Sequence, residues 1–282
     1  MGKGAVVVTG ASTGIGEACA LRLDRLGYEV FATVRRPEDE QALRARTSDR
    51  LVTMLMDITD EAAVDAAFKS IGEVVGARGL VGLVNNAGVA MGGPLEYLPL
   101  EHWRTQLEVN VIGQVCVARA ALPLLRSARG RLVFIGSLSG RVSTTLMGPY
   151  GASKFAIEAI AESLRHELRS AGVRVALIEP GAVKTAIWEK GRALADELER
   201  TLPAEALERY RSEIAAVRQG IEQQDKTGVD PDRVAEVVQR ALESSRPKAR
   251  YLVGPDAKVA ALVARWLPDG LRDRVIARFA GP

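Results

Sequence analysis

Residues 5–16 read Ala5-Val6-Val7-Val8-Thr9-Gly10-Ala11-Ser12-Thr13-Gly14-Ile15-Gly16, and this stretch decides the fold. Its first four residues are apolar and mostly β-branched, which predicts a short buried strand. Three glycines follow in the spacing G-x-x-x-G-x-G, and a helical window begins directly after them. A glycine loop in this place lets the backbone approach a pyrophosphate, and the helix N-terminus offers it free N–H groups. An ordinary tight turn would leave the same pattern, so the rest of the chain has to decide.

Apolar, β-branched runs alternate with amphipathic helical windows along most of the 282 residues. This alternation is typical of a parallel sheet with crossover helices. We expect an α/β fold with a doubly wound parallel sheet of about seven strands. The strands are predicted near 4–9, 28–34, 51–56, 81–85, 130–136, 173–179 and 249–253. No gap resembles a linker, so residues 1–255 are expected to form a single domain.

Two stretches depart from the alternation. Residues 186–227 are predicted to be a helical insertion, with one apolar stripe formed by Leu207, Tyr210, Ile214, Val217 and Ile221. It would act as a substrate lid, or simply pack as an extra helix. Residues 256–282 are predicted to be an amphipathic C-terminal tail. Its stripes are Val259, Leu262, Val263, Trp266 and Leu267, then Leu271, Val275, Ile276 and Phe279. The tail would close over an apolar pocket, pack on a partner subunit, or lie on a membrane surface.

Composition excludes several classes of function. A net charge of +3, with Arg spread among Glu and Asp, does not favour nucleic-acid binding. Two His and two Cys, Cys19 and Cys116, give no metal-ligand spacing, so no metal site is expected and both thiols are interpreted as buried apolar groups. The N-terminus resembles a first strand and not a signal peptide, and no apolar run was expected to span a bilayer. We therefore expect a cytoplasmic protein with membrane contact unlikely.

Four motifs together resemble the short-chain dehydrogenase/reductase family. They are the glycine loop, Asn85-Asn86-Ala87-Gly88, Tyr150-x-x-x-Lys154 and Pro180-Gly181, and they follow the family's order over about residues 4–255. Val34-Arg35-Arg36 and the long insertion resemble the branch of hydroxysteroid and retinol dehydrogenases. The resemblance implies a Rossmann fold and a nicotinamide cofactor. It places the cofactor on Gly10, Ser12, Thr13, Gly14, Ile15, Gly16, Asp57, Asn86, Ala87, Gly88, Tyr150, Lys154, Pro180, Gly181 and Thr185.

Residues 33–36 bear on which nicotinamide cofactor is used. About 20 residues past the glycine loop, an acidic residue would bind the ribose 2′-hydroxyl of NAD. The sequence there is Thr33-Val34-Arg35-Arg36. A guanidinium pairs with the 2′-phosphate of NADP, which a carboxylate would repel. NADP(H) is therefore favoured, with Arg35 as the main contact and Arg36 as the second, and NAD(H) is the alternative. Two solvated loop arginines, and for Asp57 a simple helix-entry role, would explain the same residues.

The catalytic candidates are Asn110, Ser137, Tyr150 and Lys154. Tyr150 and Lys154 are four residues apart, so a helix would place them on one face. A nearby ammonium would lower the pKa of the phenol and let Tyr150 act as acid or base. Ser137 follows a predicted strand and can reach the reacting oxygen. The resemblance gives Ser137 its spacing of 13 residues before Tyr150 and gives Asn110 a water in a proton relay.

The sequence thus predicts an NADP-dependent oxidoreductase that interconverts a secondary alcohol and a ketone or aldehyde. A bulky apolar substrate is expected, because the candidate walls carry no Lys or Arg: Ala90, Met91, Leu146, Met147, Ile187 and Trp188. The family resemblance suggests a homodimer or homotetramer that pairs through the helices near 101–127 and 150–171. Two alternatives are a non-catalytic NAD(P)-binding redox sensor and a membrane-surface scaffold driven by the tail.

Overall fold

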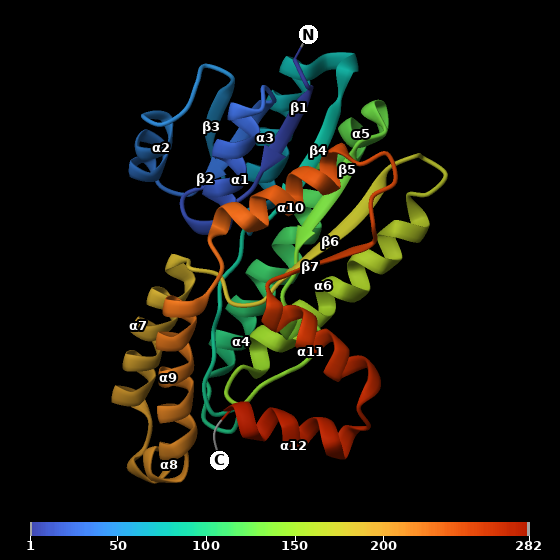
Figure 1. The fold of residues 1–282 in the computed structure, drawn as a ribbon. Helices are drawn as coiled ribbons and strands as arrows, with labels where there is room; N and C mark the ends of the chain where they lie inside the picture. The colour runs from blue at the N-terminus through green and yellow to red at the C-terminus, as the bar shows by residue number, and fades with distance from the viewer. Residues whose placement is uncertain (1, 281–282) are drawn as a thin grey trace.

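The computed structural model describes residues 2–280, apart from the side chains of residues 186, 188–191, 194, 198 and 276–280. Seven parallel strands form one sheet at the centre of the molecule (Figure 1). They are β1 (Ala5–Val8), β2 (Glu29–Val34), β3 (Leu51–Leu55), β4 (Leu80–Asn85), β5 (Arg131–Ile135), β6 (Arg174–Pro180) and β7 (Arg250–Val253). Each predicted strand is confirmed to within about two residues at either end, because short β-branched runs bounded by turn residues leave little freedom.

The strand order places a crevice beside β1. The sheet runs β3-β2-β1-β4-β5-β6-β7, so the chain leaves β1 toward β2 and later returns to its other side with β4. The register pairs Val7 with Phe31 on one side and with Leu83 on the other. In doubly wound sheets a ligand binds outside the carboxyl ends of the strands at such a reversal. The loops after β1 and β4 are the two that meet there.

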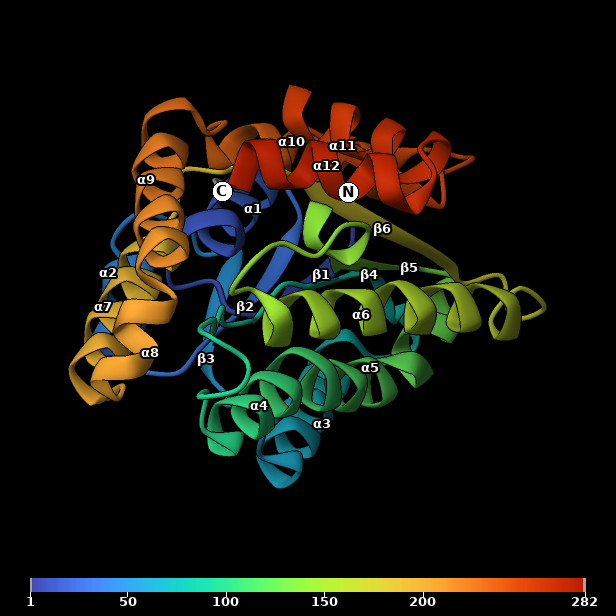
Figure 2. The same cartoon turned by 90° about the horizontal axis from the view of Figure 1, so that it is seen from below.

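Helices cover both faces of the sheet (Figure 2). The core layer containing Val8 and Val30 packs against α1 (Gly14–Arg25), α2 (Pro37–Arg44) and α10 (Pro231–Glu243). The opposite layer, with Leu83 and Phe134, packs against α3 (Glu61–Val75), α5 (Gln114–Ala128) and α6 (Gly148–Glu167). Two short 3-10 turns, η1 (Gly76–Arg78) and η3 (Leu138–Gly140), complete these layers. Cys19 is buried as expected, whereas Cys116 is only partly buried, because it lies toward the solvent edge of α5.

One continuous helical segment runs from residue 100 to residue 128. It consists of α4 (Leu100–Leu107), a π-helical turn η2 (Glu108–Gly113) and α5. By length and composition this segment could cross a membrane, so the expectation that no apolar run is long enough was wrong. Part of its apolar surface is covered within the protein, since Val117, Ala121 and Leu125 lie fully buried against the sheet.

The insertion and the tail are helical but differ in detail from the sequence analysis. The insertion contains α7 (Ala186–Thr201), α8 (Ala204–Arg209) and α9 (Arg211–Thr227). The expected single stripe was wrong, because Tyr210 leaves helical geometry (φ −105°, ψ 15°) and separates α8 from α9. The tail forms α11 (Pro255–Trp266) and α12 (Asp269–Ala280), and α12 contacts α9.

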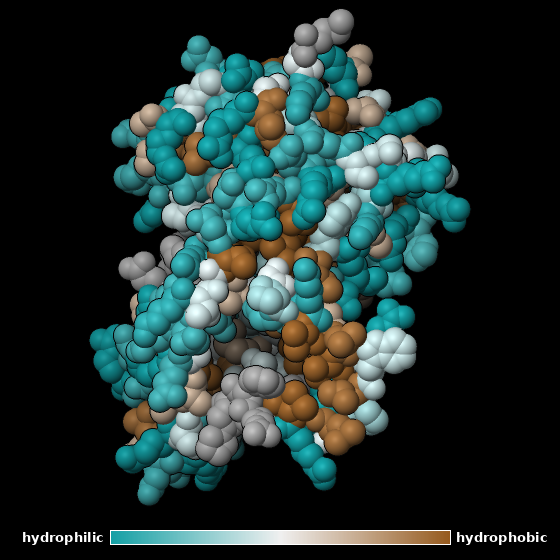
Figure 3. Space-filling model, viewed as in Figure 1, coloured by the Kyte–Doolittle hydropathy of each residue, from teal (hydrophilic) through white to brown (hydrophobic). Residues whose placement is uncertain are grey.

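The tail turns its small residues inward and its large ones outward. Ala257 and Ala261 are buried, whereas Val259, Leu262 and Trp266 are 60%, 62% and 70% exposed. Apolar side chains are visible over this part of the surface in Figure 3. This half of the predicted stripe therefore does not close over a pocket within the monomer. The predicted residues Ile276 and Phe279 have side chains outside the described part of the chain.

Candidate active site

The glycine loop between β1 and α1 has almost no room for side chains. Gly10 has φ +64°, and a Cβ there would lie 2.8 Å from the Cα of Ala87. A Cβ on Gly16 would overlap the carbonyl of Gly10 and the amide of Asn86. Gly14 has φ +62° and faces Thr185, whose Cγ2 would be 3.0 Å from an added Cβ. These glycines are required because three backbone segments meet at one point.

The first turn of α1 is open to a ligand. Thr13 is the N-cap residue, yet its side chain makes no capping hydrogen bond. The N–H groups at the start of α1 therefore have no side-chain acceptor, and the positive end of the helix dipole faces the loop. Ser12, Thr13 and Ile15 flank this turn. The donors and the crowded glycines suit the pyrophosphate of a dinucleotide, so the site meets the requirements of a nicotinamide cofactor.

Buried hydrogen bonds lock the loop after β4 against the glycine loop. The Thr9 hydroxyl accepts from the backbone N–H groups of Asn86, at 2.9 Å, and Ala87, at 3.1 Å. The Asn86 amide donates back to the carbonyls of Thr9, at 2.9 Å, and Gly10, at 3.1 Å. The sequence analysis identified Asn86 but missed Thr9. A threonine that directly follows a buried strand and precedes the first glycine was the available signal.

Three buried amides at four-residue spacing hold the same loop from the helix below. Gln106, Asn110 and Gln114 are all fully buried on one face of the 100–128 segment. The amides of Gln106 and Asn110 both donate to the carbonyl of Val89, at 3.0 and 2.9 Å. The amide of Gln114 donates to the carbonyl of Ala87 at 2.8 Å. Gln106 and Asn110 also accept from backbone N–H groups of the loop. Only Asn110 was predicted, although the polar i, i+4, i+8 stripe on an apolar helix marks all three.

Asn110 lies within the π-helical turn η2. Its Nδ2 also lies 3.1 Å from the Ser153 hydroxyl, which in turn donates to the carbonyl of Tyr150 at 2.7 Å. π-turns inside helices often mark functional sites, because they turn a side chain away from the regular helical direction. Asn110 is thus linked to the catalytic helix through Ser153. Its role in holding a water stays a prediction.

Ser137, Tyr150 and Lys154 line one small cavity of about 90 Å³ together with Ile15, Asn86, Gly88 and Thr185. Ser137 precedes η3 at the carboxyl end of β5, and its hydroxyl shares a hydrogen bond with that of Tyr150. Lys154, one turn along α6, lies 5.7 Å from the centre of the Tyr150 ring. Its ammonium donates to the carbonyl of Ile135 at 2.9 Å. The fold therefore brings a serine, a phenol and an ammonium to the glycine loop.

Burial governs the protonation of these groups. It raises the pKa of Tyr150 above its usual range, and the hydrogen bond with Ser137 only partly opposes that effect. It also lowers the pKa of Lys154 to about 8. The expectation that the ammonium lowers the pKa of Tyr150 was therefore wrong for this geometry, because the lysine is turned toward Ile135. At neutral pH the phenol holds its proton and can donate it.

Comparisons with known proteins identify the family of this chain. The family model for short chain dehydrogenase matches residues 4–195. The chain belongs to the short-chain dehydrogenase family. It is 36% identical over 274 residues to the NADPH-dependent 3-dehydrocapnine reductase of Ornithobacterium rhinotracheale, covering 95% of this chain and 94% of that one. It is 39% identical to human retinol dehydrogenase 16, covering 96% and 87% of the two chains. The resemblance to the hydroxysteroid and retinol dehydrogenase branch is confirmed.

A solved structure extends the likeness to three dimensions. The NADP+ complex of a serine dehydrogenase in its closed form matches with a TM-score of 0.75 and 29% identity, covering 89% of this chain and 95% of that one. Together with the relatives, this match makes the chain an NAD(P)-dependent oxidoreductase of the dehydrogenase/reductase type. The single-domain parallel sheet is the one that the sequence predicted.

The two arginines that follow β2 differ in their contacts. Arg36 precedes α2 and is held by Asp39 through two hydrogen bonds of 2.9 Å, so its guanidinium is already engaged. Arg35 is exposed at the carboxyl end of β2, near Asp57. Burial raises the pKa of Asp57, but hydrogen bonds from Thr59 and the charge of Arg35 outweigh it and lower that pKa overall.

The loop that contains Pro180 and Gly181 is held by Asp256, which was not predicted as a site residue. Pro180 ends β6, and the N–H of Gly181 donates to Val253 O at 2.9 Å. The carboxylate of Asp256, in the first turn of α11, accepts from the N–H of Ala182 at 2.6 Å. A Cβ on Gly181 would overlap this carboxylate. The tail therefore begins as a support for the Pro180-Gly181 loop, 74 residues away in the chain.

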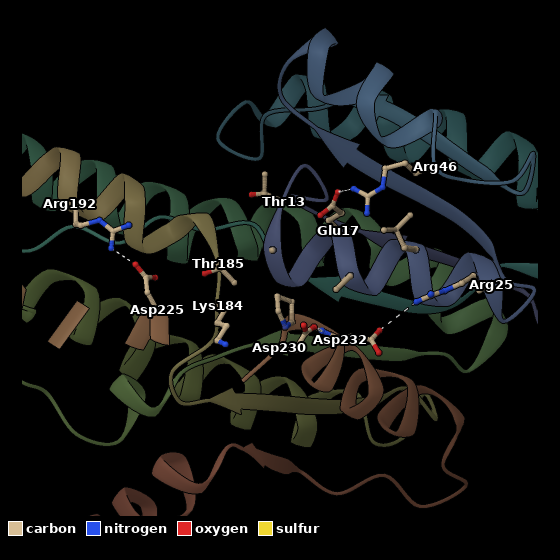
Figure 4. A pocket seen from close by; sticks show the side chains of 14 residues that line it. Thr13, Glu17, Arg25, Arg46, Lys184, Thr185, Arg192, Asp225, Asp230 and Asp232 are labelled. Atoms are coloured by element: carbon tan, nitrogen blue, oxygen red, sulfur yellow. Dashed lines mark hydrogen bonds and ion pairs between the residues drawn. The ribbon is translucent and has the colours of Figure 1, made fainter. Parts of the chain in front are cut away.

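A larger cavity of about 700 Å³ opens on the outer side of the glycine loop. Figure 4 shows Thr13, Thr185 and Lys184 in the middle of its lining, between two ion pairs. Its outer rim is formed by ion pairs between α7 and α9, Arg192–Asp225, and between α1 and α10, Arg25–Asp232 at 3.6 Å. Because Gly14 and Thr185 border it, this cavity is continuous with the cofactor loop and gives the phosphate side access to solvent.

Of the expected substrate walls whose side chains the structure describes, only one lines the catalytic cavity, and Ala90, Met91, Leu146 and Met147 do not. Ile187 lines that cavity, at the start of the insertion. Leu146 has a left-handed backbone with φ +60°, which is rare for a branched residue, and its carbonyl accepts from Gly93 at 2.7 Å. The segments with Ala90, Met91, Leu146 and Met147 are thus joined beside the site. The side chain of Trp188 lies outside the described residues.

Proposed function

We propose that this dehydrogenase uses NADP(H) to interconvert a secondary alcohol and a ketone or aldehyde on a bulky apolar substrate. One observation carries the proposal: the Ser137 and Tyr150 hydroxyls and the Lys154 ammonium line one cavity at the end of the glycine loop. A carbonyl oxygen placed there would meet two hydroxyl donors. No other grouping of the predicted site residues would activate a carbonyl.

Each of these side chains has a separate role when a carbonyl is reduced. Ser137 and Tyr150 hold the carbonyl oxygen, and Tyr150 donates its proton to that oxygen. Lys154, charged below its pKa of about 8, would support the developing negative charge on the phenol by turning from the carbonyl of Ile135 toward Tyr150. The bound nicotinamide supplies or accepts the hydride. Asn86, Ala87 and Gly88 and the Pro180-Gly181 loop, with Thr185, would hold the cofactor against this group.

NADP preference rests on Arg35. Its exposed guanidinium ends β2 where an NAD-binding chain would carry an acid, and two comparison proteins are named for NADPH or NADP+. Arg36 would contribute only after leaving Asp39. An apolar substrate is supported by Ile187 at the cavity and by the apolar segments beside it, and by likeness to retinol dehydrogenase 16.

We also propose a cytoplasmic homo-oligomer. The outer faces of the two long helices expose Leu107, Ile112 and Phe155, which are 37%, 55% and 45% accessible in the monomer. Apolar residues on a smooth helical face suit a self-complementary interface between copies. Light scattering at several protein concentrations tests this assembly, and Phe155→Glu should reduce the measured mass. A monomer at all concentrations would reject it.

The direct test is turnover. The purified protein is mixed with NADPH or NADH and a panel of long-chain, polycyclic and small ketones and aldehydes, and absorbance of the reduced cofactor is followed. The proposal expects oxidation of NADPH with the large apolar carbonyls. Binding of NADPH without turnover on any carbonyl would favour the alternative, a redox sensor that keeps the cofactor site.

A further inference from the structure

An ionic cluster of four residues lies behind the catalytic lysine, outside both cofactor loops. Its carboxylates are Glu158, one helical turn after Lys154 on α6, and Glu179 on β6. Its cations are Arg141, directly after η3, and Arg250, the first residue of β7. The Glu179 side chain is fully buried and that of Glu158 is 15% exposed. Charges this far from solvent are costly unless they are paired.

The contacts of the cluster tie four separate elements together. Arg141 binds Glu179 with both arms of its guanidinium, and the Nη2–Oε2 distance is 2.9 Å. Arg250 donates from Nε to Glu158 at 2.8 Å and from Nη2 to Glu162 at 3.0 Å. Charge-assisted hydrogen bonds therefore join the turn after β5 to strand β6, and strand β7 to helix α6.

The two carboxyl groups face each other and need a proton. Glu158 Oε1 is buried and has no donor among the described residues. Glu179 is the carboxyl group within hydrogen-bonding reach of Glu158, and such a bond forms only when one of the two carries a proton, because two ionised carboxylates have no donor. Burial and this hydrogen bond raise the pKa of Glu158 to about 7, against the opposing effect of Arg250. Arg141, Arg250 and Glu162 are the other charged groups that face the pair.

The cluster reaches the reacting atoms through the Ser137 turn. Arg141 follows Ser137 by four residues, and η3 lies between them. Gly140 packs directly on α6, because a Cβ there would lie 3.0 Å from the carbonyl of Lys154 and 3.3 Å from Cγ of Glu158. The bonds between Arg141 and Glu179 therefore fix the end of η3 to β6, at the place where η3 packs on the helix turn that carries the lysine. The position of the Ser137 hydroxyl relative to Tyr150 depends on this packing of η3 against α6.

We propose that Glu158 and Glu179 are positioning residues of the active site, which hold the Ser137 turn against the helix that carries Tyr150 and Lys154. They touch neither substrate nor cofactor and act through Ser137. The shared proton is part of the clamp, because without it two negative charges would face each other in a buried place. The inference rests on the proposed oxidoreductase activity and adds the device that keeps its geometry.

Three variants test the clamp. Glu158→Ala should lower kcat for carbonyl reduction by about tenfold to a hundredfold, the cost of a slightly misplaced catalytic group, with the NADPH Kd nearly unchanged. Glu158→Gln should restore kcat, since its amide can donate to Glu179 and its oxygen can accept from Arg250. Glu162→Gln is the matched control, because it also removes a carboxylate from Arg250 but does not reach Glu179.

A second measurement needs no substrate. A carboxyl whose pKa is raised in the folded protein adds stability that is complete below its unfolded pKa and is lost as pH rises through its folded pKa. Between about pH 5 and pH 8, the Tm of the unmutated protein should therefore fall relative to that of Glu158→Gln. Glu162→Gln should show no such divergence from the unmutated protein.

The outcomes separate the two proposals. Normal kcat in Glu158→Ala, or a loss that Glu158→Gln does not rescue, would overturn the positioning role, and parallel Tm curves would overturn the shared proton. An equal loss of NADPH affinity in Glu158→Ala would show a merely structural role. If the unmutated protein reduces no carbonyl, the proposed function fails, and the Tm curves still decide whether the proton is shared.

Discussion

The loop after β4 and the helical insertion both border the cofactor site, yet they are held in different ways. The loop is fixed by buried amides and a buried hydroxyl, chiefly Gln106, Asn110, Gln114 and Thr9, each bonded to backbone. The insertion is held by surface side chains that pair with one another. At its far end Glu96 accepts from Arg209 and from Tyr210, both at 2.9 Å.

These two kinds of contact predict different mobility for the loop and the insertion. A buried amide that loses its backbone partner leaves both groups unsatisfied, so the loop has a single arrangement. Exposed ion pairs exchange with water and salt at little cost. We therefore expect the loop after β4 to be rigid, and we propose that the insertion can open. This contrast supports a substrate lid more strongly than the apolar stripe, which Tyr210 interrupts.

Removing the proposed catalytic acid, the hydroxyl of Tyr150 on α6, should have the largest effect. Tyr150→Phe should lower kcat by about 10²- to 10⁴-fold, because general acid catalysis is lost while the ring still fills its place. The NADPH Kd should stay nearly constant. Steady-state kinetics and fluorescence titration measure the two quantities, with Tyr251→Phe as a control away from the site. Retention of more than a few per cent of activity would disprove the assignment.

Cofactor choice should respond next. Arg35→Asp should reverse the preference for NADPH over NADH, since a lost charged contact to phosphate changes affinity roughly 10- to 150-fold. Ratios of kcat/KM for the two cofactors measure the change. Arg36→Asp is the matched control and should do less, because Arg36 is bound to Asp39. Equal use of both cofactors by the unmutated protein would contradict the prediction.

Stability should reveal the difference between buried and exposed amides. Asn110→Ala should lower the free energy of unfolding by about 1–3 kcal/mol, because the N–H of Val89 loses its acceptor, although the Val89 carbonyl keeps the bond from Gln106. Gln223→Ala, an exposed amide on α9, should change it by less than about 0.5 kcal/mol. Urea unfolding of both variants makes the comparison. Similar losses of stability in both variants would show that the loop after β4 is no more rigid than the insertion.

The smallest effect is expected at the lid contact. Glu96→Gln removes the negative charge to which Arg209 and Tyr210 donate and leaves a weaker amide acceptor, so residues 186–227 should be cleaved a few-fold faster by a protease while Tm hardly changes. Added NADPH and substrate should protect the same segment in the unmutated protein. Glu101→Gln, on an exposed pair with Arg104, is the control. Cleavage unaffected by the variant and by ligands would argue for a static extra helix.

Local patterns predicted the fold and the centre of the site. The strands, the glycine loop and the Tyr150–Lys154 pair follow from periodicity, strand ends and spacing within one element, which a sequence displays directly. The amide stripe of Gln106, Asn110 and Gln114 was equally visible but was not used. Glu158 and Glu179, 21 positions apart on different elements, have no common pattern, because their meeting depends on how α6 packs against β6.

The remaining differences came from burial. The pKa of Tyr150 depends on how much solvent reaches it and on where Lys154 points, and neither is encoded in their spacing. The tail stripe had the right helical period, but the period does not say which face meets the sheet. The small Ala257 and Ala261 allow close packing there, so the larger Val259 and Trp266 are turned outward.

The contact between Asp256 and the Ala182 N–H determines where the chain may be cut. A protein that stops at Pro255 would lose the acceptor that supports the Pro180-Gly181 loop, and its failure would be mistaken for a role of the tail in substrate choice. A protein that stops at Leu267 keeps that acceptor and all of α11. Comparing the two lengths would separate the start of the tail, as a brace for the cofactor loop, from its end, as an outer cover.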